Sequence, residues 1–136
     1  MAPRVREAWE RRDVDAFVAC FSADAVYHWG PFGSPLRGHD QIRDRTQAAV
    51  SAQSDIVFEH EPLAVTQDGR GICWWTVTYA VAASGRRLQD EGIFLVTLGD
   101  DGRCIEFREW WKRARDRLTD VCGLTVAETA AHLPTT

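Results

Sequence analysis

Apolar residues in the first fifty positions recur at helical spacing. Those between residues 4 and 12 fall every three or four positions, the pattern of an amphipathic helix. Asp13 follows as a predicted N-cap, and the second helix shows the same periodicity. Its apolar positions are Val14, Phe17, Val18 and Phe21. A third helix is predicted from Asp40, taken as its N-cap, to about Gln53.

Strand-like alternation replaces this pattern in the second half of the chain. A short strand at 25–30 and a loop rich in Pro and Gly at 31–38 come first. Four consecutive strands are then predicted, at residues 55–66, 70–83, 87–98 and 103–112. The segments QDGRG, ASG and GDDG between them are typical of hairpin turns. Pro62 predicts an edge strand or a bulge, because proline has no N–H for a sheet ladder.

Helices followed by an antiparallel meander predict an α+β fold, with the helices covering one face of a curved sheet. The 136 residues are enough for one hydrophobic core. We expect a single domain over 1–136, with its core at about 4–113 and a C-terminal extension at 114–136. Thr125 and Glu128 have the spacing of a capping box within that extension.

The charge pattern excludes several classes of function. The net charge is −4 and the chain has no basic run, which disfavours nucleic-acid binding because phosphates need concentrated positive charge. Neither a membrane-spanning apolar run nor a signal-peptide core is present, so we expect a cytoplasmic protein that does not enter membranes. The four cysteines and four histidines show no metal-binding spacing. We expect free thiols, no metal and no cofactor.

The segment RRDVDAFVACFSADAVYHWGPFGSPLRGHDQIR (11–43), the four strands and DDGRCIEFREWW (100–111) together resemble a known family. They are similar to the SnoaL-like branch of the nuclear-transport-factor-2-like (NTF2-like) superfamily. The resemblance implies a cone-shaped sheet closed by helices, a small, mostly apolar ligand inside, and a homodimer through the outer sheet face. The superfamily includes isomerases, cyclases, dehydratases, epoxide hydrolases and non-enzymatic binders, so the fold alone does not fix the function.

The resemblance also argues against one activity. Ketosteroid isomerases of this superfamily use a tyrosine and two aspartates. The tyrosine position falls near Val5, the base position falls at Trp29 or Gly30, and the second aspartate position falls at Phe94. None of these residues has the required group, so any catalysis uses other side chains.

The register implied by the resemblance assigns alternate residues of the last three strands to the inside of the cone. The inward residues are Cys73, Trp75, Val77 and Tyr79, then Asp90, Gly92, Phe94 and Val96, then Ile105, Phe107, Glu109 and Trp111. Outward residues such as Trp74, Ile93, Leu95 and Trp110 are apolar enough for a dimer surface.

A few polar groups in an apolar pocket are typical of a small-molecule site. Glu109 is the first catalytic candidate, with His28 or Asp90 as the second acid or base. The candidates for substrate binding are aromatic: Trp29, Trp75, Tyr79, Phe94, Phe107 and Trp111. Each catalytic candidate has an alternative. Glu109 either faces the cavity, pairs with an arginine on the helices such as Arg6, Arg12 or Arg43, or lies at an exposed rim. Asp90 is either solvated or functional, and His28 is either a hydrogen-bonded core or rim histidine or functional.

Two functions remain open from the sequence. The first is a cofactor-independent isomerase, cyclase or dehydratase that acts on a small hydrophobic metabolite by acid–base chemistry. The second is a non-catalytic ligand-binding or dimerisation module of the same fold. An open cavity favours a small-molecule function, whereas aromatic side chains that fill the cone exclude it.

Overall fold

The computed structural model describes residues 2–30 and 32–114. Three helices, α1 (Ala2–Glu10), α2 (Val14–Val18) and α3 (Gly38–Ser51), accompany six strands. The strands are β1 (Phe21–His28), β2 (Leu36–Arg37), β3 (Gln53–Val65), β4 (Gly71–Val81), β5 (Arg87–Leu98) and β6 (Cys104–Arg113). The predicted α+β class is confirmed. The extension with Thr125 and Glu128 lies outside the described residues.

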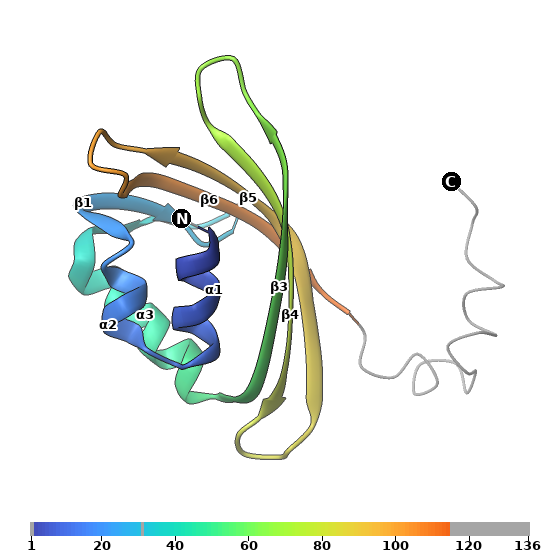
Figure 1. The fold of residues 1–136 in the computed structure, drawn as a ribbon. Helices are drawn as coiled ribbons and strands as arrows, with labels where there is room; N and C mark the ends of the chain where they lie inside the picture. The colour runs from blue at the N-terminus through green and yellow to red at the C-terminus, as the bar shows by residue number, and fades with distance from the viewer. Residues whose placement is uncertain (1, 31, 115–136) are drawn as a thin grey trace, which may run out of the picture.

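The six strands form one sheet in the order β2-β1-β6-β5-β4-β3. All neighbours are antiparallel except β1 and β6, which run parallel. Figure 1 shows this sheet bending around the three helices, so that β1, β5 and β6 lie across one end of them and β3 and β4 run along their side. The helices therefore occupy the concave face.

Gly92 on β5 permits a close approach to the neighbouring strand β6. A Cβ at this position would lie 2.0 Å from the carbonyl oxygen of Trp110 and 2.9 Å from the Cα of Trp111. Both atoms belong to the β6 backbone and cannot move aside without disturbing the ladder. A side chain of any kind is excluded here, which is why glycine occupies an interior strand position.

The structure corrects three predicted element boundaries. Asp13 caps α2 as expected, accepting a hydrogen bond from the Ala16 amide at 3.0 Å. The helix stops at Val18, however, and the fully buried Phe21 begins β1, because a residue that continues a helical period can also face the core from a strand.

The predicted loop at 31–38 contains the short strand β2, which pairs with β1. Gly38, at φ +77°, turns the chain from β2 straight into α3. The N-cap position is therefore occupied by Arg37, which makes no side-chain cap, and the prediction of Asp40 as the cap was wrong.

Both expectations for Pro62 are confirmed. β3 is an edge strand, and its register with β4 shifts between Pro62 and Ala64. A second bulge overturns one predicted orientation. Thr97 pairs with Glu106 and Leu98 pairs with Cys104, so Ile105 is the extra residue. Cys104 is fully buried and Ile105 is 42% exposed, so the prediction that Ile105 faces inward was wrong.

The core consists of aromatic and branched side chains between the sheet and the helices. Phe17 of α2, Phe21 of β1 and Phe107 of β6 are among the most deeply buried, and Phe21 lies within ring-contact distance of the other two. Burying side chains of this size stabilises a fold by roughly 1.5–3 kcal/mol each.

In the described part of the chain, none of the helices is long and apolar enough to cross a membrane.

Candidate functional site

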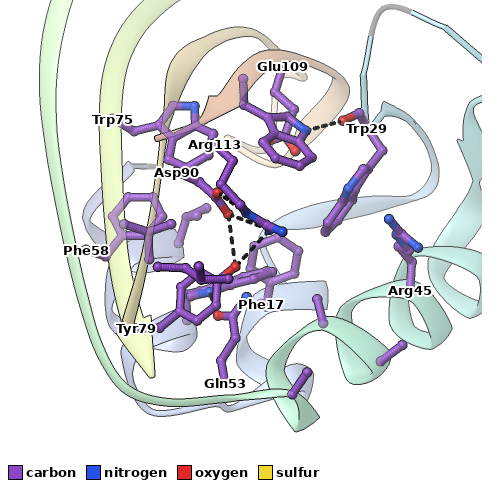
Figure 2. A pocket seen from close by; sticks show the side chains of 18 of the residues that line it. Phe17, Trp29, Arg45, Gln53, Phe58, Trp75, Tyr79, Asp90, Glu109 and Arg113 are labelled. Atoms are coloured by element: carbon purple, nitrogen blue, oxygen red, sulfur yellow. Dashed lines mark hydrogen bonds and ion pairs between the residues drawn. The ribbon is translucent and has the colours of Figure 1, made fainter. Parts of the chain in front are cut away.

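A cavity of about 410 Å³ lies between the concave face of the sheet and the helices. Residues from all three helices and from β1, β3, β4, β5 and β6 line it, mostly with apolar atoms (Figure 2). The polar side chains among them are Tyr27, Arg45, Gln53, Tyr79, Asp90, Glu109 and Arg113. The aromatic residues line the cone without filling it, which is the arrangement expected of a small-molecule site.

All six predicted substrate-binding residues line this cavity: Trp29, Trp75, Tyr79, Phe94, Phe107 and Trp111. Trp75 and Phe94 are near-parallel, with ring centroids 5.1 Å apart. The indole Nε1 of Trp75 is buried and has no hydrogen-bond partner among the described residues. On the other side, Tyr27 stacks between Trp29 and Phe107 at centroid distances of 5.1 and 4.7 Å. The walls are therefore formed by aromatic rings that pack against one another.

Glu109 projects from β6 into this apolar surround and is only 6% exposed. Its cross-strand partner on β5 is Phe94, which offers no charge or hydrogen bond. Loss of hydration raises the pKa of Glu109 from its ordinary 4.5 to about 8. A hydrogen bond from Tyr27 and the charge of Arg45 oppose this rise, and the charge of Asp90 adds to it. At neutral pH the carboxyl group is mainly protonated.

The three arginines considered as partners of Glu109 bind elsewhere. Arg6 pairs with Glu10 at 3.3 Å, and Arg43 pairs with Asp15. The Arg12 Nε donates to the carbonyl oxygen of Val50 at 3.1 Å. None of these three arginines pairs with Glu109, and the exposed-rim interpretation was wrong because the carboxyl group is buried. The helix arginine whose charge acts on Glu109 is Arg45.

Asp90 is 7% exposed and lies in a polar network rather than in solvent. The Arg113 Nε donates to one carboxylate oxygen at 2.8 Å, and the Tyr79 hydroxyl donates to the other at 3.2 Å. Arg113 also donates to the Tyr79 hydroxyl at 2.9 Å, closing the triangle seen in Figure 2. The hydrogen bond to the Asp90 carboxylate raises the pKa of Arg113, so the guanidinium group stays charged.

His28 does not reach the cavity. Tyr27 and Trp29 on either side of it face inward, so strand alternation directs His28 to the outer face of the sheet. There its Nε2 lies 3.9 Å from Glu106, which also accepts a hydrogen bond from Arg108 at 3.2 Å. Partial burial lowers the pKa of His28. The placement of His28 as the second group at the cavity was therefore wrong.

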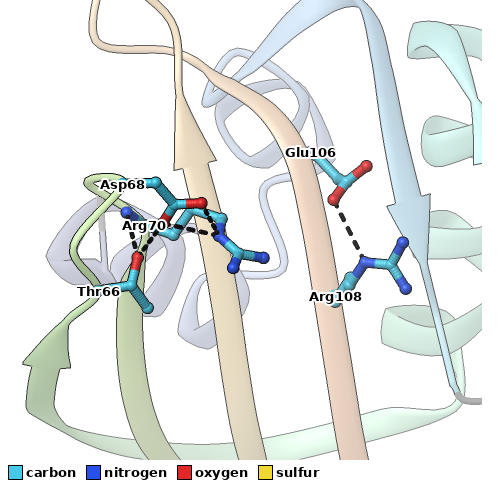
Figure 3. A network of polar contacts seen from close by, with 5 residues as sticks. All are labelled: Thr66, Asp68, Arg70, Glu106 and Arg108. Carbon is cyan, nitrogen blue, oxygen red and sulfur yellow. Dashed lines mark hydrogen bonds and ion pairs between the residues drawn. The ribbon is translucent and has the colours of Figure 1, made fainter.

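Figure 3 shows the Glu106–Arg108 pair on the outer face of β6, with the helices behind the sheet. The same view shows a second network in the β3–β4 turn, where Asp68 accepts hydrogen bonds from Thr66 and Arg70. Both groups are exposed to solvent and lie away from the cavity. They hold surface turns and strands in place and do not belong to the candidate site.

Sequence reasoning missed Tyr27, Arg45 and Arg113. Tyr27 lay on a strand whose alignment slips by one residue, so its face was not assigned. Arg113 lay just beyond the predicted end of the last strand. Its register opposite Asp90 is the signal that would have found it, since cross-strand neighbours of opposite charge commonly pair. Arg45 could be placed only once the position of α3 against the cavity was known.

A second, smaller cavity of about 280 Å³ lies towards the β3–β4 turn. It shares Val5, Phe94 and Phe107 with the main cavity, and its remaining lining residues carry no charge.

In residues 2–30 and 32–114, no group of three or more His, Cys, Asp or Glu residues could hold a metal ion.

The family model that matches the sequence is the SnoaL-like domain, over residues 3–107. No curated protein matches the sequence at a significant level. The fold is similar to that of SalBIII, an epoxide hydrolase/cyclase-like enzyme with a role in pyran ring formation in the polyether salinomycin. The identity is 19%, the TM-score is 0.71, and the similarity covers 82% of this chain and 87% of that one.

Two further solved structures have the same fold. An NTF2-like protein of unknown function from Exiguobacterium sp. 255-15 is 17% identical, with a TM-score of 0.70 over 82% of this chain and 97% of its own. A computationally designed 17-OHP binder is 12% identical, with a TM-score of 0.70 over 83% of this chain and 95% of its own. At these identities the similarity establishes the fold and leaves the chemistry to the residues of this chain.

Proposed function

Because this chain belongs to the SnoaL-like family, we propose that it binds a small, mostly apolar molecule in its cone and transforms it by cofactor-independent proton transfer. Isomerisation, cyclisation and dehydration are the reactions that this chemistry serves. The observation that carries the proposal is Glu109, a buried carboxyl group with a pKa of about 8 beside an open cavity of about 410 Å³. Perturbed titratable groups in clefts are frequent at catalytic sites.

Glu109 is the proposed general acid/base. A pKa near the working pH allows a group both to donate and to accept a proton, and such a group typically contributes 10²–10⁴-fold to a rate. Tyr27 orients the carboxyl group through its hydrogen bond. The aromatic walls hold the ligand and exclude water, so that a proton passes between the ligand and Glu109 rather than to solvent.

Asp90, Tyr79 and Arg113 form the second polar group of the proposed site. Asp90 is already engaged by Arg113 and Tyr79, so we assign the trio a supporting role: Arg113 faces the cavity with a permanent positive charge. Asp90 offsets this charge, and the role assigned to Arg113 is to donate hydrogen bonds to an oxyanion that develops on a ligand when a proton is removed. His28 has no part in this scheme, because it lies on the outer face.

The second candidate function is a non-catalytic ligand-binding module. The pairing of Asp90 with Arg113 favours this candidate. Among the described residues, it leaves Glu109 as the only carboxyl group of the cavity without a guanidinium partner. That the fold can serve binding alone is illustrated by the designed 17-OHP binder. Chemistry and binding therefore need an experiment to separate them.

Native mass spectrometry of the purified protein, followed by extraction and identification of the bound molecule, supplies the test ligand. Incubation of that molecule or its precursor with the protein then measures turnover. We expect Glu109→Gln to lower turnover by about 10²–10⁴-fold while ligand binding persists. The matched control is Glu106→Gln, on the same strand but on the outer face. Unchanged turnover in Glu109→Gln would remove Glu109 from the mechanism, and binding without any turnover would favour the second candidate.

We also propose that the chain forms a homodimer through the outer sheet face. Trp110 is 42% exposed there, and Trp74, Ile93 and Leu95 are half-buried beside it on neighbouring strands. Apolar patches of this kind are typical of protein interfaces.

The three described cysteines, Cys20, Cys73 and Cys104, are free thiols, which supports a proposed location in the reducing cytoplasm.

A further inference from the structure

Arg45 differs from the other arginines near the helices in what it contacts. It lines the cavity from α3, and its guanidinium group lies 4.8 Å from the ring centroid of Trp29 (Figure 2). Within residues 2–30 and 32–114 it has no carboxylate partner, whereas Arg43, two residues earlier, is paired with Asp15. A guanidinium held over an aromatic ring keeps its hydrogen-bond donors free for a ligand.

The charges that line the cavity do not balance. Arg113 and Asp90 offset one another through their ion pair. Glu109 is mainly uncharged at neutral pH, because burial raises its pKa to about 8. The positive charge of Arg45, an exposed residue of α3 that lines the cavity, is therefore left over beside the ring of Trp29. Such a site favours a ligand that brings one negative charge.

We propose that the ligand of the cone is a small apolar acid, whose carboxylate is bound by Arg45 above Trp29 while its apolar body occupies the aromatic part of the cavity. This inference rests on the proposed small-molecule function and specifies its substrate class. Arg45 is a specificity-determining residue in this scheme, since guanidinium and carboxylate groups form paired, charge-assisted hydrogen bonds.

The position of Arg45 also connects the anion site to the proposed chemistry. Burial raises the pKa of both Tyr27 and Glu109, and the charge of Arg45 opposes that rise at each of them. Trp29 stacks on Tyr27, and Tyr27 hydrogen-bonds Glu109, so a continuous set of contacts leads from the guanidinium to the carboxyl group. A carboxylate held at Arg45 would thus anchor the ligand on the side of the cavity where proton transfer is proposed.

Isothermal titration with 2-naphthoic acid and 2-naphthamide at neutral pH tests the inference, because the two probes share one apolar body and differ in charge. We expect the acid to bind about tenfold to a hundredfold more tightly than the amide. Arg45→Gln should remove that preference and leave amide binding unchanged. Arg43→Gln, an exposed neighbour on the same helix, is the matched control and should behave as wild type. Thermal melts of each variant check that the fold is kept.

The outcomes separate this inference from the proposed function. Equal binding of acid and amide by the wild-type protein overturns the anion site but keeps the small-molecule cavity. A preference for the acid that survives in Arg45→Gln has the same meaning. Failure of both probes to bind, together with a neutral molecule recovered from the purified protein, also overturns the anion site alone. Failure of both probes with no molecule recovered counts against both proposals.

Discussion

Asp90 and Glu109 occupy the same cavity on adjacent strands, yet their surroundings differ. Both are nearly fully buried, at 7% and 6% exposure. Asp90 is held by a guanidinium group and a phenol, in hydrogen bonds of 2.8–3.2 Å. Glu109 has no ion pair among the described residues; it has the Tyr27 hydroxyl and aromatic neighbours, and its pKa rises to about 8 although the charge of Arg45 opposes the rise. Equal burial therefore produces a structural ion pair in one case and a titratable acid in the other.

The strand register is the physical origin of this difference. Asp90 lies directly opposite Arg113 across the β5–β6 ladder, and Glu109 lies opposite Phe94. Cross-strand neighbours on one face of a sheet are close enough to contact, so one carboxylate meets a cation and the other meets a ring. A protein that needed both acids only for stability would gain nothing from leaving Glu109 unpaired, because an unpaired buried charge opposes folding.

The largest expected effect is on the pH dependence of stability. Glu109 titrates near 4.5 when unfolded and near 8 when folded, so between these values the folded state binds more protons than the unfolded state. Stability therefore falls as pH rises through this window. The pKa difference corresponds to at most about 5 kcal/mol, reached above pH 8. Glu109→Gln, neutral throughout, should be several kcal/mol more stable than wild type at pH 8, and the difference should vanish near pH 4.

Denaturant unfolding at a series of pH values measures this effect. Glu106→Gln serves as the control, because that carboxylate lies on the outer face in partial contact with water. Parallel pH profiles for wild type and Glu109→Gln would mean that Glu109 is not the unpaired acid of the comparison.

A smaller effect is expected at the Asp90 end. Arg113→Met leaves the Asp90 carboxylate buried with only Tyr79 as a partner. Removing one partner of a fully buried pair costs about 3–5 kcal/mol, but the Arg113 side chain is 48% exposed, so we expect a loss of about 2 kcal/mol in the free energy of unfolding. Arg108→Met, which breaks the exposed pair with Glu106, should cost less than about 1 kcal/mol. Equal losses in the two variants would show that Asp90 is not held by its ion pair.

Much of the fold follows from local patterns in the sequence. The four long strands and the α2 cap at Asp13 are where alternation and capping chemistry predicted them. The bulge position of Pro62 was found because proline lacks a backbone donor. The errors came from features that alternation does not encode. The extra residue Ile105 reverses which side chains of β6 face inward on one side of the bulge. Gly38 starts α3 two residues before Asp40, the residue predicted to cap the helix.

The candidate site was predictable where it depends on strand parity and not where it depends on register. Parity placed Glu109, Asp90 and the aromatic lining of β4 to β6 inside the cone, and all of them line the cavity. Tyr27 was missed because its place follows from the β1–β6 pairing, which joins residues far apart in the chain. Arg113 was missed because β6 runs one residue beyond its predicted end. Without this long-range information, the prediction placed His28 at the cavity, whereas in the structure its neighbours Tyr27 and Trp29 line the cavity.

The central claim is that Glu109 is an unpaired, mainly protonated acid inside an open cavity. Its titration can be followed directly by NMR, using protein labelled with ¹³C at the glutamate side-chain carboxyl carbons and Glu109→Gln to assign the signal. We predict a midpoint near pH 8 for the Glu109 signal. A midpoint near 4.5 would contradict the account, because Glu109 would then be charged at neutral pH and fixed in place like Asp90.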